Sequence, residues 1–527
     1  MVIATVVALG VRLFTLTRPG FLTQSTEYDD GVYLGAAIRM TQGVMPYHDF
    51  AFVQPPGILL LMTPAALFAR VTSSTDGLAL ARVLTVLAST ACVPLAGRLV
   101  RHRGTLVTAL TCAIAAIYPS DIAAAHTLLL EPWMNLLCLL GANAAFSRGG
   151  LAAKPSRLAW AGVAIGFAGV VKFWAAAPAL VILVICLLAH DELRIKRTLA
   201  YLGGLIGAFV IPLLPFVAYG PMTFFRSTIV YQAARVGTYT PLSLRLAHIT
   251  GLIDVLNIAG GLSLRAGSQS LYGQAVDADT APAMPHVVPY VIMLVLVAVI
   301  GAGFYLGRRA IVATEWFALA TAVIALAGIL YYSAFFYHYP AFPGPWLAIV
   351  TGVALGQLCM RMHLTFRRVL IGVVAFGFAC ATVLQIAEVA PLTTPAGAAE
   401  FAKLIPPGAC VVTDQVSLVI SADRFSAAKP GCPVVIDALA TTLVLTHGTS
   451  VQGGANNDHP AIAQWRKILS KAQYVWLSPN HWRRIPWPPY EARWFNEHFK
   501  QIWPVTTKKF PNSTWVRGIG NLFERIS

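Results

Sequence analysis

The chain has 527 residues, of which 57% are hydrophobic and 11% are charged, and its mean hydropathy is +0.68. Because average globular domains carry about 25% charged residues, this composition excludes an ordinary soluble protein, together with the collagen-like, disordered and disulfide-scaffold classes. It favours a polytopic membrane protein with some extramembrane mass. The net charge of +16 does not require a nucleic-acid partner, because membrane proteins concentrate basic residues in their cytoplasmic loops.

Apolar runs predict about eleven transmembrane helices. The first run, from Met1 to about Leu16, lacks a basic start and a small-residue cleavage site, so we interpret it as a retained helix and not as a signal peptide. The two runs that flank Lys172 are expected to form a tight helical hairpin. The runs after the first cover roughly residues 78–98, 105–118, 131–147, 158–172, 174–189, 199–219, 287–306, 313–331, 342–360 and 369–389.

Basic clusters predict the orientation of these helices. Five clusters fall between alternate spans, as the positive-inside rule requires. They are Arg98/Arg101/Arg103, Arg148/Lys154/Arg157, Arg194/Lys196/Arg197, Arg308/Arg309 and Arg361/Arg367/Arg368. The apolar segment from Pro56 to about Ala69 would break this pattern if it crossed, and it is shorter than the roughly 20 residues that a span needs. We therefore expect an interfacial or re-entrant helix there, with the N-terminus in the cytoplasm and the C-terminus outside.

Two domains are expected from the change in composition along the chain. Residues 1–390 form a multi-spanning membrane domain, whose long first exterior loop covers residues 17–77. Residues 391–527 carry polar turns, many aromatic side chains and three short β-like runs, which are Cys410–Asp414, Pro433–Asp437 and Tyr474–Leu477. About 135 residues suffice to bury a separate core, so we predict an α/β domain here. We expect the protein in the plasma membrane, with this domain on the extracytoplasmic side.

The cysteines agree with an exterior C-terminal domain. Six of the eight lie in predicted spans, where they are expected to be inert packing residues. Cys410 and Cys432 are the two in the C-terminal domain, and each begins a predicted strand. We expect a disulfide between them in an oxidising compartment, with two buried free thiols as the alternative.

The first exterior loop concentrates acidic residues. Glu27, Asp29 and Asp30 fall within four positions, close to the end of a span, where carboxylates are costly unless they face water or a polar cavity. A carboxylate in this place could act as a general base toward an acceptor hydroxyl, or it could bind a metal. A solvated acidic loop explains the same residues.

Five short motifs occur in a fixed order along residues 1–390. The first combines Asp29-Asp30, Tyr33, the stretch Gly43 to Phe50 with Pro46-Tyr47 and Asp49, and the pair Pro55-Pro56. The others are Tyr118-Pro119, Leu130-Glu131-Pro132, Lys172 after a glycine-rich helix, and Phe336-Tyr337-His338-Tyr339-Pro340. Together they resemble the protein O-mannosyltransferase-like enzymes of the glycosyltransferase C superfamily, which includes the bacterial aminoarabinose transferase of lipid A. The C-terminal domain resembles that of actinobacterial members.

The resemblance implies a reaction and a base. Such enzymes transfer a sugar from a polyprenyl-phosphate carrier to an acceptor on the outer side of the membrane, with inversion. The family's base position corresponds to Asp29. The next position is usually Glu and is Asp30 here, for which we expect a supporting role, as for Tyr33. Asp49 is the alternative base, and capping of the turn at Pro46 and Tyr47 is its alternative role.

The phosphate of the sugar donor requires cations or hydrogen-bond donors at the outer interface. Lys172 is the first candidate, with snorkelling to lipid head groups as the alternative. Arg235 could clamp the same phosphate, or it could lie on a solvated helix face. His338 and Tyr339 end a span on the same side, where an interfacial tyrosine belt explains the tyrosine equally well. Glu131 and Arg12 are two supporting residues. Glu131 could order Lys172, bind a metal, or simply stand at the start of a helix. The expected partner of Arg12 is an acid of the first exterior loop.

The sequence thus predicts a polyprenyl-phosphate-sugar-dependent membrane glycosyltransferase that acts on a cell-envelope glycan, glycolipid or protein. Mannose is the first expectation for the sugar, and arabinofuranose from a decaprenyl-phosphate donor is the alternative. No cofactor is certain, and a divalent metal stays open. The alternatives from another class are a flippase or transporter of lipid-linked sugars, and a non-catalytic envelope scaffold.

Overall fold

The computed structural model describes residues 1–233, 240–251, 287–308, 311–332, 334–390, 398–425, 429–503 and 520–526. The chain forms two compact units. The first, which we term the helical unit, comprises Met1–Leu16, Val83–Pro212 and Thr238–Leu392. The second, which we term the mixed unit, comprises Thr17–Arg82, Leu213–Gly237 and Thr393–Ser527. The mixed unit therefore combines the C-terminal residues with two earlier segments that the expected division at residue 390 leaves in the membrane domain.

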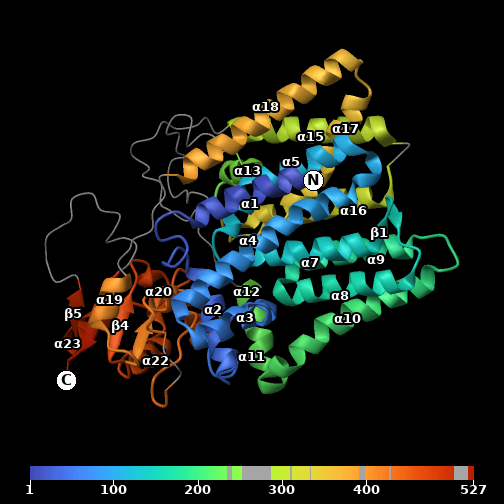
Figure 1. Ribbon diagram of the computed structural model, residues 1–527. Helices are drawn as coiled ribbons and strands as arrows, with labels where there is room; N and C mark the ends of the chain where they lie inside the picture. The colour runs from blue at the N-terminus through green and yellow to red at the C-terminus, as the bar shows by residue number, and fades with distance from the viewer. Residues whose placement is uncertain are drawn as a thin grey trace. The chain divides into compact units, whose positions relative to one another are not determined.

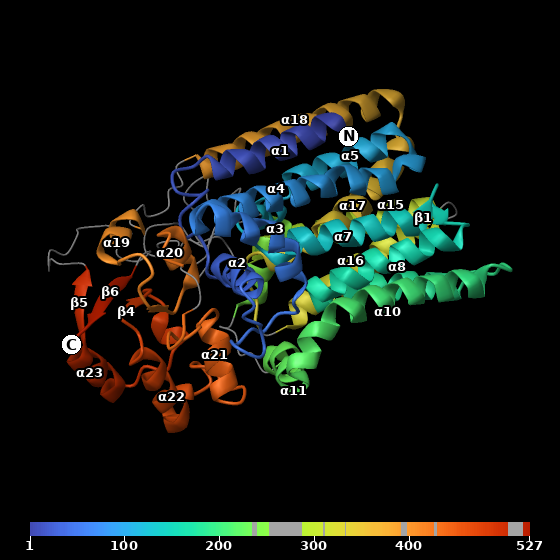
Figure 2. The same cartoon turned by 60° about the horizontal axis from the view of Figure 1, so that its bottom comes forward.

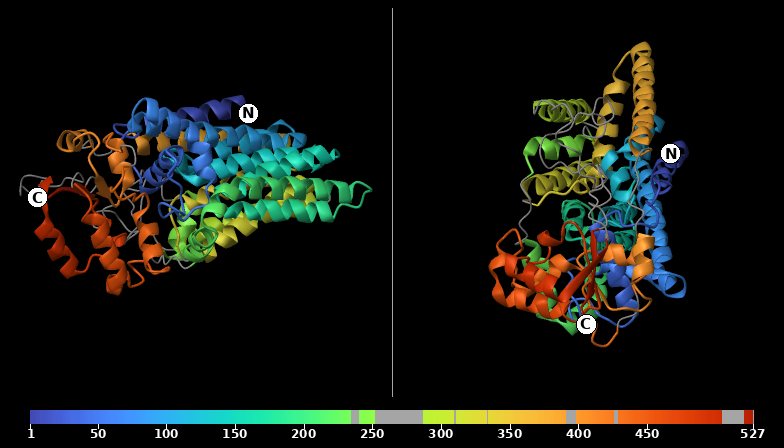
Figure 3. Two further views of the ribbon diagram at one scale, coloured as in Figure 1. Left: turned by 90° about the horizontal axis from the view of Figure 1, so that it is seen from below. Right: turned by 90° about the vertical axis from the view of Figure 1, so that its left-hand side faces the viewer.

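Long helices that run in a common direction build the helical unit, as Figure 1 and the left view of Figure 3 show. Within it α7 packs on α8, α5 on α17 and α9 on α16. The helices that lie wholly in this unit are α1 (Val2–Leu16), α5 (Thr105–Ile117), α6 (Pro119–Ala125), α7 (Leu130–Ala145), α8 (Pro155–Val171), α9 (Ala176–Leu187), α13 (Leu242–Thr250), α15 (Val287–Gly307), α16 (Ala313–Tyr331), α17 (Gly344–Met360) and α18 (Leu364–Val389). Two more, α4 (Ser74–Leu99) and α10 (Arg194–Tyr219), are shared between the units. A two-residue hairpin, β1 (Phe146–Ser147) with β2 (Gly150–Leu151), joins α7 to α8.

Several of these helices are long and apolar enough to cross a membrane. Within the described ranges, α4, α10, α15, α16 and α18 meet that condition, and α5 with α6 add a sixth span if their 51° bend is counted as a break within one span. Helices α1, α3, α8 and α17 and the segment Phe173–Leu187 are apolar but have 10–17 residues. At 1.5 Å per residue they reach at most about 26 Å, against roughly 30 Å of hydrocarbon. The helices indicate a membrane location, and their lengths support fewer spans than the eleven predicted.

Residues 17–77, expected as a loop, contain two helices of the mixed unit. Helix α2 (Tyr28–Thr41) carries Asp29 and Asp30 in its first turn. Helix α3 (Gly57–Val71) begins after Pro56, where the sequence predicts a short apolar helix. Its 15 residues extend only about 22 Å. Helix α2 packs against α3 and against α20 (Val416–Ser421) of the C-terminal part, so this segment is folded into the mixed unit.

A four-stranded sheet organises the rest of the mixed unit (Figure 2). The strand order is β3-β4-β6-β5, in which β3 (Val411–Thr413) is parallel to β4 (Tyr474–Leu477). The other two pairings, of β6 (Asn521–Arg525) with β4 and with β5 (Phe499–Trp503), are antiparallel. The other helices of this unit are α11 (Pro221–Phe225), α12 (Tyr231–Ala233), α19 (Ala398–Leu404), α20, α21 (Ala438–Leu445), α22 (His459–Leu469) and α23 (Pro489–His498). Trp465 and Trp476 are fully buried in its core.

One predicted strand is wrong. Two of the three β-like runs form β3 and β4, but Pro433–Asp437 has no strand pairing. The two edges of β4 are already taken by β3 and β6, and Asp437 instead serves as the N-cap of α21. The strands β5 and β6, which complete the sheet, follow no clear alternation of buried and exposed residues, and the sequence analysis did not predict them.

Candidate functional site

A buried charged cluster lies at helix ends in the helical unit. Glu131 lies in the first turn of α7, where the helix dipole favours an acid. Lys172 follows the last residue of α8 in an extended conformation, with φ −155° and ψ 131°, before a 3₁₀ turn leads into α9. His338 directly precedes a second 3₁₀ turn, Tyr339–Ala341, between α16 and α17. Three segments far apart in the sequence thus contribute to one place.

Ion pairs join these three side chains. The Lys172 Nζ lies 2.5 Å from Oε1 of Glu131, and His338 Nδ1 lies 3.1 Å from Oε2 of the same carboxylate. Glu131 is fully buried, whereas the side chains of Lys172 and His338 each keep 10% of their surface exposed. A buried charge is costly unless it is paired. Glu131 therefore orders the side chains of Lys172 and His338, and ordering Lys172 is one of the roles that the sequence analysis left open for it.

Aromatic rings enclose the ammonium group. The Lys172 Nζ lies 3.6 Å from the ring centroid of Trp174 and 4.5 Å from that of Tyr339. The two rings meet edge to face, with centroids 4.6 Å apart. Ring faces attract a cation without neutralising it. We call Glu131, Lys172, Trp174, His338 and Tyr339 the Lys172 cluster. The sequence analysis missed Trp174, although an aromatic residue two positions after an isolated lysine was a usable signal.

The Lys172 cluster has the chemistry of an anion site. An ammonium group, an imidazole and a phenol can each donate a hydrogen bond to a phosphate oxygen.

The sequence analysis predicted two further cations, Arg235 and Arg12. Arg235 lies outside the described residues. Arg12 is buried, and its guanidinium donates to Oγ of Ser89 and to the carbonyl oxygen of Ala116, each at 2.9 Å. Asp121 lies within electrostatic reach of it. These partners belong to the helical unit, whereas the sequence pointed to an acid of the first loop.

In the mixed unit, Asp30 is committed to an ion pair. It is fully buried and contacts the guanidinium of Arg82, which is fully buried as well. Arg82 also donates to the carbonyl oxygen of Phe21 and to Oγ1 of Thr26, each at 2.8 Å. Asp30 therefore supports the fold of this segment, in line with the supporting role expected for it. Arg82 was not predicted, because 52 residues separate the partners.

Asp29 has the opposite environment. It is half-buried in the first turn of α2, and its carboxylate makes no hydrogen bond or ion pair with any residue that the structure describes. Asp49, in contrast, accepts a hydrogen bond from the backbone N–H of Met45 at 2.7 Å and pairs with His48 at 2.8 Å. That contact is the turn-capping role considered for Asp49. Tyr33 is buried and meets Phe52 edge to face at 6.4 Å, so it serves the packing of α2.

Tyr28, directly before Asp29, is fixed by the C-terminal part of the mixed unit. Its hydroxyl donates to Oδ1 of Asp437 at 2.7 Å, and the guanidinium of Arg484 lies 4.0 Å above its ring. Burial, followed by the nearby Asp437 carboxylate, raises the pKa of Tyr28 well above its usual value. The hydroxyl therefore keeps its proton at neutral pH and remains a donor. The sequence analysis did not predict that these three residues meet.

Cys410 and Cys432 form a disulfide in the mixed unit, with Cα atoms 5.6 Å apart. For a metal, the described part of the chain contains no group of three or more His, Cys, Asp or Glu side chains placed to hold an ion.

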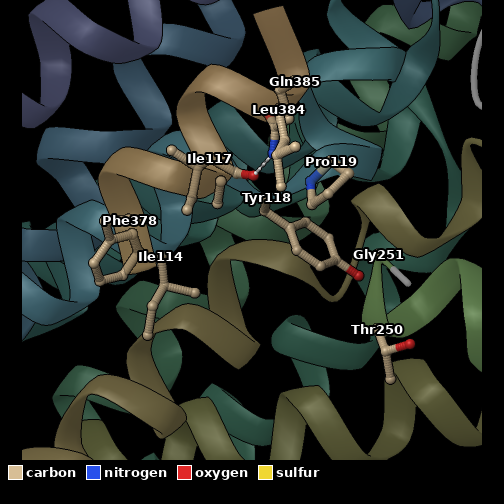
Figure 4. A pocket seen from close by; sticks show the side chains of 10 residues that line it. Ile114, Ile117, Tyr118, Pro119, Thr250, Gly251, Phe378, Leu384 and Gln385 are labelled. Atoms are coloured by element: carbon tan, nitrogen blue, oxygen red, sulfur yellow. Dashed lines mark hydrogen bonds between the residues drawn. The ribbon is translucent and has the colours of Figure 1, made fainter. Parts of the chain in front are cut away.

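A separate cavity of about 230 Å³ lies in the helical unit, at the bend between α5 and α6 (Figure 4). Its lining is mostly apolar, with Ile114, Ile117, Phe378 and Leu384 among the residues that face it. Gln385 donates a hydrogen bond to the carbonyl oxygen of Ile117. None of the described residues that line this cavity is an acid, a base or a metal ligand, so we do not include it in the candidate site.

Comparisons with known proteins identify the fold. No family model matches the sequence, and no curated protein matches it. Among solved structures, the chain is similar to ArnT from Cupriavidus metallidurans bound to undecaprenyl phosphate, with a TM-score of 0.57 and 14% identity over 99% of this chain and 97% of that one. The apo form of ArnT gives a TM-score of 0.55 and 14% identity over 91% and 93% of the two chains.

An archaeal enzyme adds a second comparison. The Archaeoglobus fulgidus oligosaccharyltransferase, in complex with Zn and sulfate, gives a TM-score of 0.54 and 13% identity over 91% of this chain and 68% of that one. ArnT and the oligosaccharyltransferase are both glycosyltransferases of the C class. The superfamily resemblance of the motifs is therefore confirmed at the level of the fold: this chain has the glycosyltransferase C fold.

Proposed function

We propose that this protein is a membrane glycosyltransferase that moves a sugar from a polyprenyl-phosphate donor to an acceptor outside the cytoplasm, with inversion at the anomeric carbon. The fold supports the enzyme class, and the ArnT structure with undecaprenyl phosphate supports a lipid-phosphate donor. The observation that carries the proposal is the contrast among the acids of the 17–82 segment, of which Asp29 has no partner among the described residues while Asp30 and Asp49 are bound.

A single displacement assigns each group a task. The acceptor hydroxyl oxygen attacks the anomeric carbon, the bond from that carbon to the phosphate oxygen breaks, and Asp29 takes the hydroxyl proton. The leaving polyprenyl phosphate gains negative charge as the bond breaks. In our proposal Lys172 stabilises that charge, with His338 and Tyr339 as further donors and Arg235 as a candidate that the sequence alone supports. Glu131 and Trp174 hold Lys172 in place.

Donor, acceptor and orientation are proposed from the sequence. The basic loop clusters support a cytoplasmic N-terminus, with the 17–77 segment and residues 391–527 outside the cytoplasm. The motif resemblance supports mannose as the sugar and a cell-envelope glycan, glycolipid or protein as the acceptor, with arabinofuranose as the alternative sugar. A divalent metal stays an open addition to this scheme.

The test is transfer by the full-length protein in lipid nanodiscs. Polyprenyl-phosphate mannose and polyprenyl-phosphate arabinofuranose are supplied in separate reactions with an envelope extract as acceptor, and released polyprenyl phosphate is measured. We expect Asp29→Asn to lower the rate at least about 100-fold, the contribution of a general base. The control is Asp76→Asn, the same change at an exposed acid of the mixed unit whose side chain, among the described residues, accepts a hydrogen bond from Ser73 alone.

Two outcomes would contradict the proposal. Asp29→Asn with a rate near that of the control would remove Asp29 as base. Transport of the lipid-linked sugar across liposomes by the purified protein, with no transfer, would favour the flippase alternative instead.

A further inference from the structure

One carboxylate oxygen links the beginnings of two helices in the mixed unit. Oδ1 of Asp437 accepts the Tyr28 hydroxyl at 2.7 Å, and Tyr28 is the first residue of α2. The same oxygen accepts the backbone N–H of Ala440 at 2.8 Å and so caps α21. The Tyr28 oxygen in turn accepts the backbone N–H of Leu439 at 3.2 Å. The first turn of α2 is thus tied to the first turn of α21, 409 residues away.

The ring of Tyr28 is held as firmly as its hydroxyl. The guanidinium of Arg484 lies 4.0 Å above the ring. Arg484 is itself fixed, because its Nη1 donates to Asp414 at 2.8 Å and to Gln415 at 3.0 Å. Asp414 is buried and accepts the backbone N–H of Ser478 at 2.6 Å. These hydrogen bonds hold Arg484 in place behind the ring.

A third contact fixes the next turn of the helix. Gly31 approaches α20 so closely that an added Cβ would lie 2.1 Å from the backbone nitrogen of Ser417. Oγ of Ser25, just before α2, lies 2.7 Å from Oγ of Ser417. The C-terminal part of the mixed unit thus contacts the chain on both sides of Asp29.

We propose that Tyr28, Asp437 and Arg484 are positioning residues for the reaction, and that the C-terminal part of the chain serves to place Asp29. This inference rests on the proposed function. Asp29 has no bond of its own among the described residues, so the position of its carboxylate follows from the backbone of the first turn of α2. A displacement of about 1 Å in a reacting group can lower a rate about 100-fold. A contact that fixes this turn therefore acts on the rate without touching the substrate.

The experiment compares three variants of the full-length protein in nanodiscs. Tyr28→Phe removes only the hydroxyl, Asp437→Ala removes its acceptor, and Asp437→Asn keeps an oxygen that can accept both hydrogen bonds. We expect the first two to lower kcat about 10-fold or more, with the KM for the lipid-linked donor within about twofold, because the donor phosphate is bound elsewhere. Asp437→Asn should recover most of the lost kcat.

A matched control removes an equivalent hydroxyl from the same unit. Tyr474 on β4 donates to Oε1 of Glu524 at 3.0 Å, on the exposed side of the sheet. We expect Tyr474→Phe to keep kcat within about twofold. A kcat for Tyr28→Phe equal to that of Tyr474→Phe would overturn the inference, and so would a failure of Asp437→Asn to recover kcat. If Asp437→Ala does not fold, Tyr28→Phe and Asp437→Asn still decide the question.

The reference variant is Asp29→Asn. If it abolishes transfer while Tyr28→Phe stays fully active, this inference fails and the proposed base stands. If Asp29→Asn keeps transfer, the proposed base and the inference fall together.

Discussion

Two buried ion pairs, one in each unit, have similar composition and different surroundings. In the mixed unit, Arg82 and Asp30 are both fully buried, and the guanidinium also bonds a hydroxyl and a carbonyl oxygen of the segment that precedes α2. In the helical unit, Glu131 is fully buried, while Lys172 is 10% exposed and lies against two ring faces. The first cation is bound by acceptors on several sides. The second bonds one buried carboxylate and lies against two ring faces.

The difference indicates how a buried cation can serve either the fold or a ligand. A guanidinium bonded to acceptors on several elements fixes those elements together. An ammonium steadied by π faces keeps its charge and its donors for a bound anion. The comparison predicts that damage to the first pair affects stability, whereas damage to the second affects the reaction.

The largest effect is expected from Arg82→Met. It leaves Asp30 charged and buried, which typically costs about 3–5 kcal/mol of unfolding free energy. The double variant Arg82→Met/Asp30→Asn should recover much of that loss, because it removes the uncompensated charge. Thermal unfolding of the full-length protein in detergent measures both. A stable Arg82→Met protein that has lost only its activity would contradict the assignment of this pair to the fold.

Lys172→Met should act mainly on the reaction. One charge-assisted hydrogen bond contributes about 1.5–3 kcal/mol, so transfer efficiency should fall roughly 10- to 100-fold. The unfolding temperature should fall less than for Arg82→Met, because His338 remains 3.1 Å from the Glu131 carboxylate. Adding Glu131→Gln should restore stability without restoring transfer. Recovery of transfer in that double variant would remove Lys172 from phosphate binding.

Trp174→Leu tests the ring faces with a smaller change. A cation–π contact contributes about 0.5–2 kcal/mol, so the donor KM should rise about 2- to 30-fold while the Lys172–Glu131 pair persists. Phe173→Leu, at the neighbouring position, is the matched control, since Phe173 instead packs on Phe209 at 6.2 Å. Equal effects at the two positions would mean that Trp174 acts only through packing.

Asp49→Asn should have the smallest effect. The side chains of Asp49 and His48 are 37% and 55% exposed, and exposed pairs contribute about 0–1 kcal/mol. An amide oxygen can still accept the Met45 N–H, so the turn should persist. Initial rates should stay within about threefold of the unmodified protein. A loss as large as that of Asp29→Asn would make Asp49 the base.

Sequence reasoning succeeded where a local signal sufficed. Each apolar run corresponds to a helix, because hydropathy over a helix length is a local property, and Val411–Thr413 and Tyr474–Leu477 form strands in short buried runs. It failed at Pro433–Asp437, where hydrophobicity was correct but the run has no strand pairing and ends as the N-cap of α21. The count of eleven spans stays a prediction, because five of the apolar helices have only 10–17 residues.

The site shows the same limit. Glu131, Lys172 and His338 were selected by resemblance to a family, and spacing alone could not have brought residues 41 and 207 positions apart together. The partner of Asp30 and the partner of Tyr28 lie 52 and 409 residues away, so no local pattern contains them. The Asp30–Arg82 pair depends on how the 17–82 segment folds on itself, and the Tyr28–Asp437 bond depends on how that segment packs against the C-terminal part of the mixed unit. Both are set by tertiary structure.

The contact at Gly31 has a consequence for building hybrid proteins. Since an added Cβ would lie 2.1 Å from a backbone atom, neither α2 nor α20 can change shape independently at this point. Exchange of residues 398–526 alone for those of a related enzyme should give a chain that misassembles, whereas joint exchange with residues 17–82 should give one that assembles. The two stretches are far apart in the sequence, but we expect that they must be exchanged together.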